Sequence, residues 1–395
     1  MEIKFSPPDI TEAEIAAVTD AMRSGWITTG PRTKEFERRI AEFCGTDRVV
    51  CLNSATAGLE LTLRILGVGE GDEVITSAYT YTASASVIAH VGAKIVLCDI
   101  DPRGFELDLD KLGALINERT KVIIPVDIGG RLCDYEGIYR LIESKKNLFR
   151  AKNSLQETFG RIIVLVDAAH SFGAERDGKK SGSFADFSSF SFHAVKNLTT
   201  AEGGAVTWRS RPGLDNDEIY HRFMLEALHG QSKDALSKTI LGAWEYDIEC
   251  LGYKCNMTDI MAAVGTVQLK RYPGLLCRRE EIVRRYDSAF GEGFSHLQHF
   301  GVNEKSSFHL YLLRPENYGE EERNRLIERL AEAGIACNVH YKPLPMFTAY
   351  RKLGFRIEEY PNAYSVYRNE ISLPLHTLLT DEQVDYIAEK VRSLI

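Results

Sequence analysis

Short runs of apolar residues recur along the first 210 residues, and longer segments with a helical pattern separate them. The runs are rich in Val, Ile and Leu and do not alternate with polar residues, which favours strands buried on both faces, as in parallel sheets. Because strand and helix follow each other several times, the pattern predicts a doubly wound α/β sheet with right-handed crossovers. The predicted strands cover residues 48–53, 72–76, 94–100, 121–128 and 161–169.

Polar and turn residues delimit the elements between these strands. Residues 11–25 predict a helix, because a Thr precedes acidic residues at its start and a Gly ends it. Residues 175–182 contain Asp177-Gly178, a pair typical of a tight hairpin turn. Residues 141–161 are basic and helix-like, and we interpret them as a solvated outer helix or a helical insertion rather than a binding patch.

The pattern changes near residue 258. A long helical stretch begins there, and Pro273 within it is expected to kink or break the helix. A smaller α+β section follows, with a strand predicted at 306–314, a helix at 321–334 and a last helix from Asp381. We therefore predict two domains: a large α/β domain at 1–257, and a long helix with a small C-terminal α+β domain at 258–395.

Composition and charge place the chain among globular proteins. Of its 395 residues, 44% are hydrophobic and 26% are charged, and the net charge is −8. This acidity argues against a general nucleic-acid binder, although a local basic pocket that binds an anion is compatible with it.

The N-terminus lacks the apolar core of a signal peptide, and no run approaches the roughly 18 apolar residues of a membrane span. We therefore expect a cytoplasmic protein.

The eight cysteines and the neighbouring histidines are not spaced as metal ligands. No cysteine pair has CxxC spacing, and several cysteines lie in apolar runs, which is typical of buried free thiols in a reducing compartment. His296 and His299 are three residues apart without a Cys or an acidic pair nearby, so we interpret both as exposed. No metal site is expected.

Residues suited to chemistry follow several of the apolar runs. In open α/β sheets, ligands bind at the carboxyl ends of the strands. Asn53 to Thr56 open a helix after the first predicted strand, where N–H groups and hydroxyls can bind an anion, although such polar caps are common. Asp167 ends a very apolar strand, where a carboxylate is costly unless it meets a cation; a helix cap is the alternative. Ser191 and Lys196 follow a further strand-like run of Ser and Phe.

Together these residues predict a site for pyridoxal phosphate. The aldehyde of this cofactor forms a Schiff base with a lysine, its pyridine nitrogen pairs with an aspartate, and its phosphate binds at a helix N-terminus. Lys196, Asp167 and the segment from Asn53 to Thr56 match these three requirements. A structural salt bridge is the alternative interpretation of Lys196 taken alone.

A series of ordered motifs also resembles the sugar-nucleotide aminotransferases of the DegT/DnrJ/EryC1/StrS family, which are fold-type I pyridoxal phosphate enzymes. The resemblance runs nearly from end to end and implies a large, mostly parallel sheet domain with a smaller C-terminal α+β domain. The motifs are SGWITTGPRTKEFE (24–37), NSATAGLELTL (53–63), GDEVITSAYTYTAS (71–84), GAKIVLCDID (92–101), VDAAHSFGA (166–174), SFHAVKNLTTAEGG (191–204), GYKCNMTDIMAAVGTVQL (252–269), NVHYKPLP (338–345) and ISLPLHTLLTDEQV (371–384).

The resemblance implies roles for four residues around the cofactor ring. Lys196 would form the Schiff base and carry the proton between the cofactor and the sugar carbon. Asp167 would meet the pyridine nitrogen, and His170 would lie near the phenolic oxygen of the ring. Tyr81 would stack on the ring face, as offset aromatic pairs do.

It also implies which residues bind the phosphate and the substrate. Ala55, Thr56 and Ser191 would bind the phosphate, and Asn256 would reach it from the other subunit of a homodimer with shared active sites. Lys254 would approach the diphosphate of the substrate. The sugar end would be lined by His340 and Tyr341.

The function implied by the resemblance is transfer of an amino group, with glutamate as the expected donor, to a nucleotide-linked keto sugar. The residues around Lys196 resemble the branch that aminates C4 of a 4-keto hexose, for amino sugars of polysaccharides or natural products. A C3 aminotransferase and a cofactor-dependent sugar dehydratase are the alternatives among enzymes. A cofactor-binding regulatory protein without turnover is the alternative of another class, and the set of Lys196, Asp167 and His170 disfavours it.

Overall fold

A seven-stranded sheet forms the centre of the molecule in the computed structural model, which describes residues 2–233 and 245–395. The strand order is β1-β9-β8-β5-β4-β2-β3. The five strands from β8 to β3 are parallel, whereas β9 is antiparallel to both of its neighbours. The strands are β1 (Val49–Leu52), β2 (Glu73–Ser77), β3 (Lys94–Cys98), β4 (Thr120–Ile124), β5 (Ile163–Asp167), β8 (Phe187–Ser191) and β9 (Gly204–Trp208). The predicted doubly wound, mostly parallel sheet is confirmed.

Side chains of the central strands alternate between two cores, one on each face of the sheet. Leu165 of β5 packs in a core with Leu59 of helix α3 (Ala55–Ile65), whereas Val164 and Val166 pack in a core with Tyr272 of helix α9 (Asp259–Ala289). This burial on both faces explains why the strands read as continuous apolar runs.

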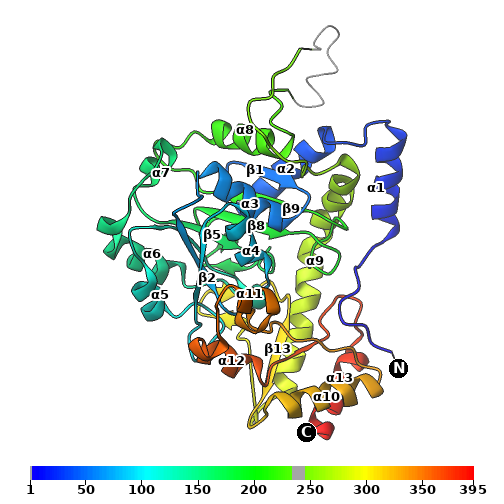
Figure 1. Cartoon of the computed structure of the whole chain (residues 1–395). Coiled ribbons are helices and arrows are strands. Elements are labelled where there is room, and N and C mark those ends of the chain that lie inside the picture. Colours follow the sequence, from blue (N-terminus) through cyan, green and yellow to red (C-terminus); the bar gives the residue numbers. More distant parts are fainter. Residues whose placement is uncertain (1, 234–244) are drawn as a thin grey trace.

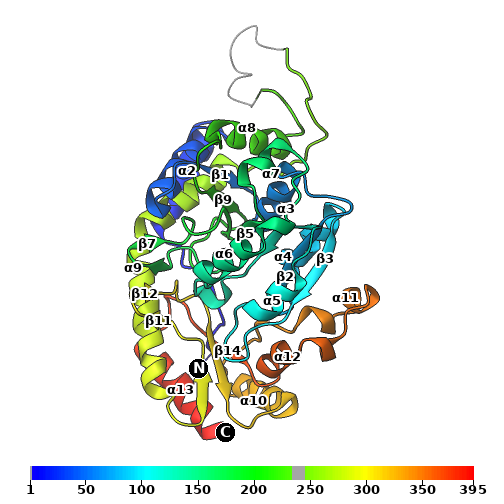
Figure 2. The ribbon, with the colours of Figure 1, turned by 90° about the vertical axis from the view of Figure 1, so that its left-hand side faces the viewer.

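The N-terminal helices are α1 (Glu12–Arg23), α2 (Pro31–Cys44), α3 (Ala55–Ile65), α4 (Ala83–His90), α5 (Leu109–Leu115), α6 (Tyr135–Ser144), α7 (Ser154–Phe159) and α8 (Asn216–Ala227) (Figures 1 and 2).

A third core lies in the C-terminal part, below the large sheet in Figure 1. It is built on the antiparallel sheet β10-β13-β14 and on side chains of the helices α9, α10 and α13. Ile3 joins this core, where its N–H donates to Gly334 and its carbonyl accepts from Ala336. The C-terminal elements are α9 (Asp259–Ala289), β10 (Phe294–His296), β13 (Tyr311–Pro315), α10 (Glu320–Glu332), α11 (Thr348–Lys352), α12 (Pro361–Tyr367), β14 (Ile371–Leu373) and α13 (Asp381–Leu394).

Helix α9 passes through Pro273 without a break. The expectation that this proline breaks the helix is therefore wrong. The helix packs against α1 and α2 over its N-terminal half and against α13 near its other end. Tertiary packing of this kind contributes more to the stability of a helix than local propensity does.

Two further local predictions have opposite outcomes. The predicted hairpin forms between β6 (Glu175–Arg176) and β7 (Lys179–Lys180), and both turn residues, Asp177 and Gly178, have positive φ. The hairpin pairs with β11 (Phe300–Gly301) and β12 (Glu304–Lys305) in a four-stranded sheet. The interpretation of His296 and His299 as exposed is wrong. His296 is half-buried, and the ring of His299 is buried beside Tyr311, with its Nδ1 2.7 Å from the Ser306 hydroxyl.

Among the described residues, no helix is long and apolar enough to span a lipid bilayer.

The start of α9 holds the N-terminal loop and the start of α2 in place. The buried carboxylate of Asp259 accepts hydrogen bonds from the N–H groups of Gly30 (2.8 Å), Arg32 (3.1 Å) and Thr33 (2.9 Å) and from the Thr33 hydroxyl (2.7 Å). Gly30, the residue before α2, has no side chain to accept these N–H groups. A residue 229 positions away in sequence therefore caps the helix.

We expect Asp259→Ala to lower the free energy of unfolding by about 2–4 kcal/mol, because a cap is lost and several buried donors lose their acceptor. Asp20→Ala is the matched control, since Asp20 also binds this segment, through Arg32, but from an exposed position. Its cost should stay below about 1 kcal/mol. Urea unfolding followed by circular dichroism measures both, and equal effects of the two substitutions would contradict the capping role.

Candidate active site

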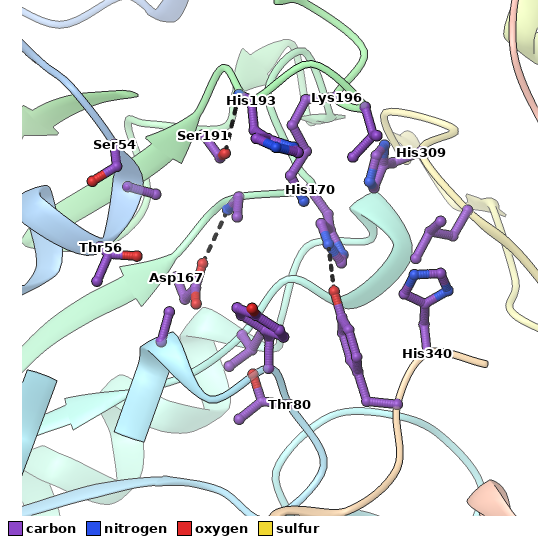
Figure 3. A pocket seen from close by; sticks show the side chains of 18 of the residues that line it. Ser54, Thr56, Thr80, Asp167, His170, Ser191, His193, Lys196, His309 and His340 are labelled. Carbon is purple, nitrogen blue, oxygen red and sulfur yellow. Dashed lines mark hydrogen bonds between the residues drawn. The ribbon is translucent and has the colours of Figure 1, made fainter. Parts of the chain in front are cut away.

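A cavity of about 360 Å³ opens at the carboxyl ends of the parallel strands. Figure 3 shows Ser54 and Thr56 at one end of it and His309 and His340 at the other. The cavity brings together nine of the residues singled out from the sequence: Ala55, Thr56, Tyr81, Asp167, His170, Ser191, Lys196, His340 and Tyr341. These side chains come from separate strands and loops, so the parallel topology accounts for their meeting.

Asp167 is a buried carboxylate at the end of β5. Its Oδ2 accepts a hydrogen bond from the Ser84 hydroxyl at 2.7 Å, and its Oδ1 accepts from the N–H of Ala169 at 3.2 Å. Burial raises the pKa of Asp167, while these hydrogen bonds and the charge of Lys196 oppose the rise. A carboxylate in this position is stabilised most by a cation placed in the cavity. Sequence reasoning missed Ser84, which lies within a family motif but follows no strand end.

Lys196 lies in the loop after β8, where its N–H donates to the carbonyl of His193 at 2.9 Å. Its side chain is half-buried and lines the cavity (Figure 3). Burial lowers the pKa of Lys196 to about 8, although the charge of Asp167 acts in the opposite direction. A substantial share of the amine is therefore neutral near neutral pH, as a nucleophilic lysine requires.

His170 is neutral, and its hydrogen bonds define its tautomer. Its Nδ1 accepts from the N–H of Gly129 at 3.2 Å, so the ring proton lies on Nε2, which is 3.0 Å from the hydroxyl of Tyr341. Burial lowers the pKa of His170 well below its usual value, and the charge of Lys196 lowers it further. Because Nε2–H donates to Tyr341, the hydroxyl hydrogen of Tyr341 is free to donate into the cavity.

His309 is a cavity residue that sequence reasoning missed. Its ring centre lies 4.4 Å from that of His170, and its Nδ1 lies 2.8 Å from Oδ1 of Asn197. The amide of Asn197 donates to the carbonyl of Ser307 at 2.6 Å, so its oxygen faces His309 and the proton of His309 lies on Nδ1. The sequence pattern around His309 predicted only a strand, and nothing in it indicated this contact.

Backbone groups at the start of α3 form the end of the cavity opposite His340. Ala55 and Thr56 are the first two residues of the helix, so their N–H groups have no partner within it. The hydroxyl of Ser54, the residue before the helix, accepts from the N–H of Ala57, the residue after Thr56, at 3.1 Å and leaves those of Ala55 and Thr56 free. β9 approaches closely here, since an added Cβ at Gly204 would lie 2.5 Å from the nitrogen of Ala55. Free N–H groups at a helix N-terminus favour an anion such as phosphate.

Tyr81, Ser191 and His340 complete the lining of the cavity. Tyr81 is 60% exposed, and its ring centre lies 6.0 Å from that of Tyr341. The hydroxyl of Ser191 accepts from the N–H of His193 at 3.4 Å. The carbonyl of His340 accepts from the hydroxyl of buried Tyr79 at 2.7 Å, which fixes the loop that carries His340 and Tyr341.

Lys254 and Asn256 do not line this cavity. The amide of Asn256 donates to the hydroxyl of Thr29 at 2.5 Å, and Nζ of Lys254 donates to Oδ1 of Asn256 at 2.7 Å. Lys254 is exposed. Asn256 is half-buried, and within one chain neither residue reaches the cavity.

The chain is similar over its full length to members of one enzyme family. The model of the DegT/DnrJ/EryC1/StrS aminotransferase family matches residues 8–392. The chain is 36% identical to spore coat polysaccharide biosynthesis protein SpsC of Bacillus subtilis, with 100% of this chain and 97% of SpsC covered. It is 34% identical to the UDP-4-amino-4-deoxy-L-arabinose–oxoglutarate aminotransferase of Shewanella sediminis, with 100% and 99% covered.

A solved structure has nearly the same fold. Spr1654 of Streptococcus pneumoniae, assigned as a sugar aminotransferase and solved in a PLP form, is 55% identical with a TM-score of 0.97. The match covers 100% of this chain and 98% of Spr1654.

The lowered pKa of Lys196 predicts unusual reactivity in the cofactor-free protein. At pH 8 about half of Lys196 should be neutral, against less than about 1% of an ordinary lysine. Competitive labelling with an amine reagent, followed by peptide mass spectrometry over a pH series, should give a midpoint near pH 8. Exposed Lys179 is the internal comparison.

The substitution Asp167→Asn tests whether the charge of Asp167 raises the pKa of Lys196. Removal of the carboxylate charge takes away the contribution that raises the pKa of Lys196, so the labelling midpoint should move to lower pH. A midpoint of Lys196 equal to that of Lys179, or a shift to higher pH in the variant, would show that burial does not control this lysine.

Proposed function

The chain belongs to the DegT/DnrJ/EryC1/StrS aminotransferase family, and we propose that it transfers the amino group of glutamate to C4 of a nucleotide-linked 4-keto hexose. It is a sugar aminotransferase. The observation that carries the proposal is that Lys196, with its lowered pKa, and the buried carboxylate of Asp167 line one cavity. The products would be 2-oxoglutarate and a nucleotide-linked 4-amino sugar, a precursor of polysaccharides or natural products.

The relatives support this choice of donor and sugar position. The name of the Shewanella sediminis relative gives a 4-amino-4-deoxy sugar and oxoglutarate, which is glutamate with a keto oxygen in place of its amino group. SpsC is named for polysaccharide biosynthesis. The motif around Lys196 also resembles the branch that aminates C4.

The reaction uses pyridoxal phosphate, and the residues of the cavity fit this cofactor. When bound, pyridoxal phosphate supplies an electron-poor ring that accepts the electron pair left when a C–H bond next to nitrogen breaks. Ala55 and Thr56, with the hydroxyl of Ser191, would hold the phosphate at the helix N-terminus. Asp167 would hold the proton on the pyridine nitrogen, because that cation offsets the cost of burying the carboxylate.

Lys196 and the ring of Tyr81 would act next to the reacting carbon. Lys196 is the one lysine among the described residues that line the cavity. The lowered pKa of its amine lets it both take up and release a proton near neutral pH. Tyr81 would cover the open face of the cofactor, which agrees with its exposed position at the cavity. His170 would remain neutral and fix the hydroxyl of Tyr341 as a donor toward the substrate.

A homodimer with shared active sites would supply the cations that one chain lacks. The described residues that line the cavity include Lys196 but no arginine, whereas a sugar nucleotide carries a diphosphate. Lys254 of the partner subunit would bind this diphosphate, and Asn256 of the partner subunit would reach the cofactor phosphate. Segments on both sides of residues 234–244 project from the body beyond α8 (Figures 1 and 2). Leu251 and Ile248, which follow residues 234–244 in the sequence, are 95% and 46% exposed, and such exposed apolar side chains suit burial against a second copy.

A half-reaction assay tests the proposed function. Glutamate should bleach the visible absorbance of the bound cofactor, and a panel of UDP-, dTDP- and GDP-linked 4-keto sugars should then include one that restores it quickly. Lys196→Ala should slow both steps by at least about 100-fold. Asp167→Asn should slow both by about 100- to 1000-fold without a change in circular dichroism.

The outcomes separate the rival functions. Restoration by a 3-keto sugar alone would identify a C3 aminotransferase. Loss of water from the sugar without transfer of an amino group would identify a dehydratase. A cofactor that glutamate leaves unchanged would favour a regulatory protein and contradict the proposal.

Mixed dimers test whether the sites are shared. Lys196→Ala and Asn256→Ala variants should each be inactive, yet their mixture after subunit exchange should regain about a quarter of wild-type activity. Half of the dimers are then hybrids, and each hybrid has one intact site. A mixture as inactive as its parents, with exchange confirmed by native mass spectrometry, would show that Asn256 acts in its own subunit.

A further inference from the structure

Buried Glu370 lies behind the cavity and takes no part in the mechanism described above. It stands directly before β14 and is fully buried. Its Oε2 accepts from the N–H of His340 at 2.8 Å, and its Oε1 accepts from the hydroxyl of Ser372 at 2.6 Å. The hydroxyl of Ser372 in turn lies 2.8 Å from Nδ1 of His340. One side chain thus contacts His340 twice, once directly and once through Ser372.

The outer nitrogen of His340 is open to the cavity. His340 lines the cavity, and its ring stacks on Phe5 with 5.5 Å between ring centres. Its Nε2 has no hydrogen-bond partner among the described residues and is not among their buried unpaired atoms. Nδ1 and Nε2 of one neutral ring share a single proton, so the state of Nδ1 decides whether Nε2 donates or accepts.

We infer that Glu370, acting through Ser372, sets the tautomer of His340 and so decides whether His340 offers the substrate a hydrogen-bond acceptor or a donor. When Glu370 is ionised, Ser372 must donate to it, so Nδ1 of His340 carries the proton and Nε2 presents a lone pair. When Glu370 is protonated, it donates to Ser372, Ser372 donates to Nδ1, and Nε2 carries the proton. Glu370 is therefore a positioning residue for the proposed substrate site.

The surroundings make Glu370 the group that titrates in this cluster. Burial raises the pKa of Glu370 to about 8, while Ser372 and the N–H of His340 oppose the rise. The guanidinium groups of Arg323 on α10 and Arg314 on β13 also oppose it. The carboxyl should therefore keep its proton below about pH 8 and lose it above.

The other groups facing Glu370 should keep one state over the working range. Burial lowers the pKa of His340 to about 3 and raises that of Cys337 to about 12. It also raises the pKa of Tyr79 and Tyr341 above the usual value. Between about pH 6 and pH 10 these four groups stay neutral. The charge of Lys196 also acts on His340, and the free amine titrates near pH 8, but in the pyridoxal phosphate-bound enzyme this amine would be held by the cofactor. A change in the tautomer of His340 in that form therefore reports on Glu370.

The tautomer can be measured without turnover. Solid-state ¹⁵N NMR of the pyridoxal phosphate-bound enzyme, labelled in histidine, distinguishes Nδ1–H from Nε2–H, and loss of one signal in His340→Gln identifies the residue. In the wild type we expect Nε2–H below about pH 8 and Nδ1–H above it. A single tautomer at all pH values would overturn the inference.

Substitutions distinguish a relay, the hydrogen-bond chain from Glu370 through Ser372 to Nδ1 of His340, from a role of Glu370 in packing alone. In Glu370→Gln the amide oxygen should accept from the N–H of His340 and the NH₂ should donate to Ser372, which locks Nε2–H at every pH. Ser372→Ala should remove the pH step by breaking the relay. Glu37→Gln, the same change at another buried glutamate, should keep the wild-type step.

Kinetics give a second readout, which rests on the proposed function. Because Lys196 also titrates near pH 8, the readout is a comparison of variants: the pH profile of kcat/KM for the keto sugar should change shape near pH 8 in Glu370→Gln and match the wild type in Glu37→Gln. A wild-type pH step that persists in the NMR spectra of Glu370→Gln would overturn the role of Glu370. If the NMR step is present but no keto sugar reacts, the relay stands and the proposed reaction fails.

Discussion

The cost of burying charge at the carboxyl edge of the sheet governs this structure. Asp167 and Lys196 carry the charges at the centre of the cavity, and burial pushes the pKa of each toward its neutral form. A chain selected only for stability would place apolar residues there. The geometry instead holds an anion and a readily neutralised amine where a cationic ring nitrogen and an aldehyde can meet them.

Three histidines around this pair, His170, His309 and His340, are kept neutral by burial, and each contacts a different partner. Gly129 fixes the proton of His170, Asn197 fixes that of His309, and Ser372 contacts His340. Neutral rings add directed donors and acceptors without a further charge that would compete with Lys196. The partners come from both parts of the chain, so the contact between the large sheet and the C-terminal section is part of the site.

Much of this arrangement was predictable from the sequence, and the physical reasons differ between residues. Buried parallel strands leave an apolar pattern, and motifs placed Asp167 and Lys196 at strand ends, so their meeting followed from topology. Ser84 and His309 were missed because their roles arise from contacts between distant segments, which leave no periodic signal. Tertiary packing also overrode local patterns at Pro273, which does not end α9, and at His299, which is buried.

The amine of Lys196 is the group proposed to hold the cofactor, and this assignment can be tested directly. Borohydride reduction of the enzyme with bound pyridoxal phosphate makes the bond between cofactor and lysine permanent, and peptide mass spectrometry then locates it. We expect one modified residue, Lys196, in nearly every chain. Modification of a different lysine, or no modification while the cofactor remains bound, would contradict it.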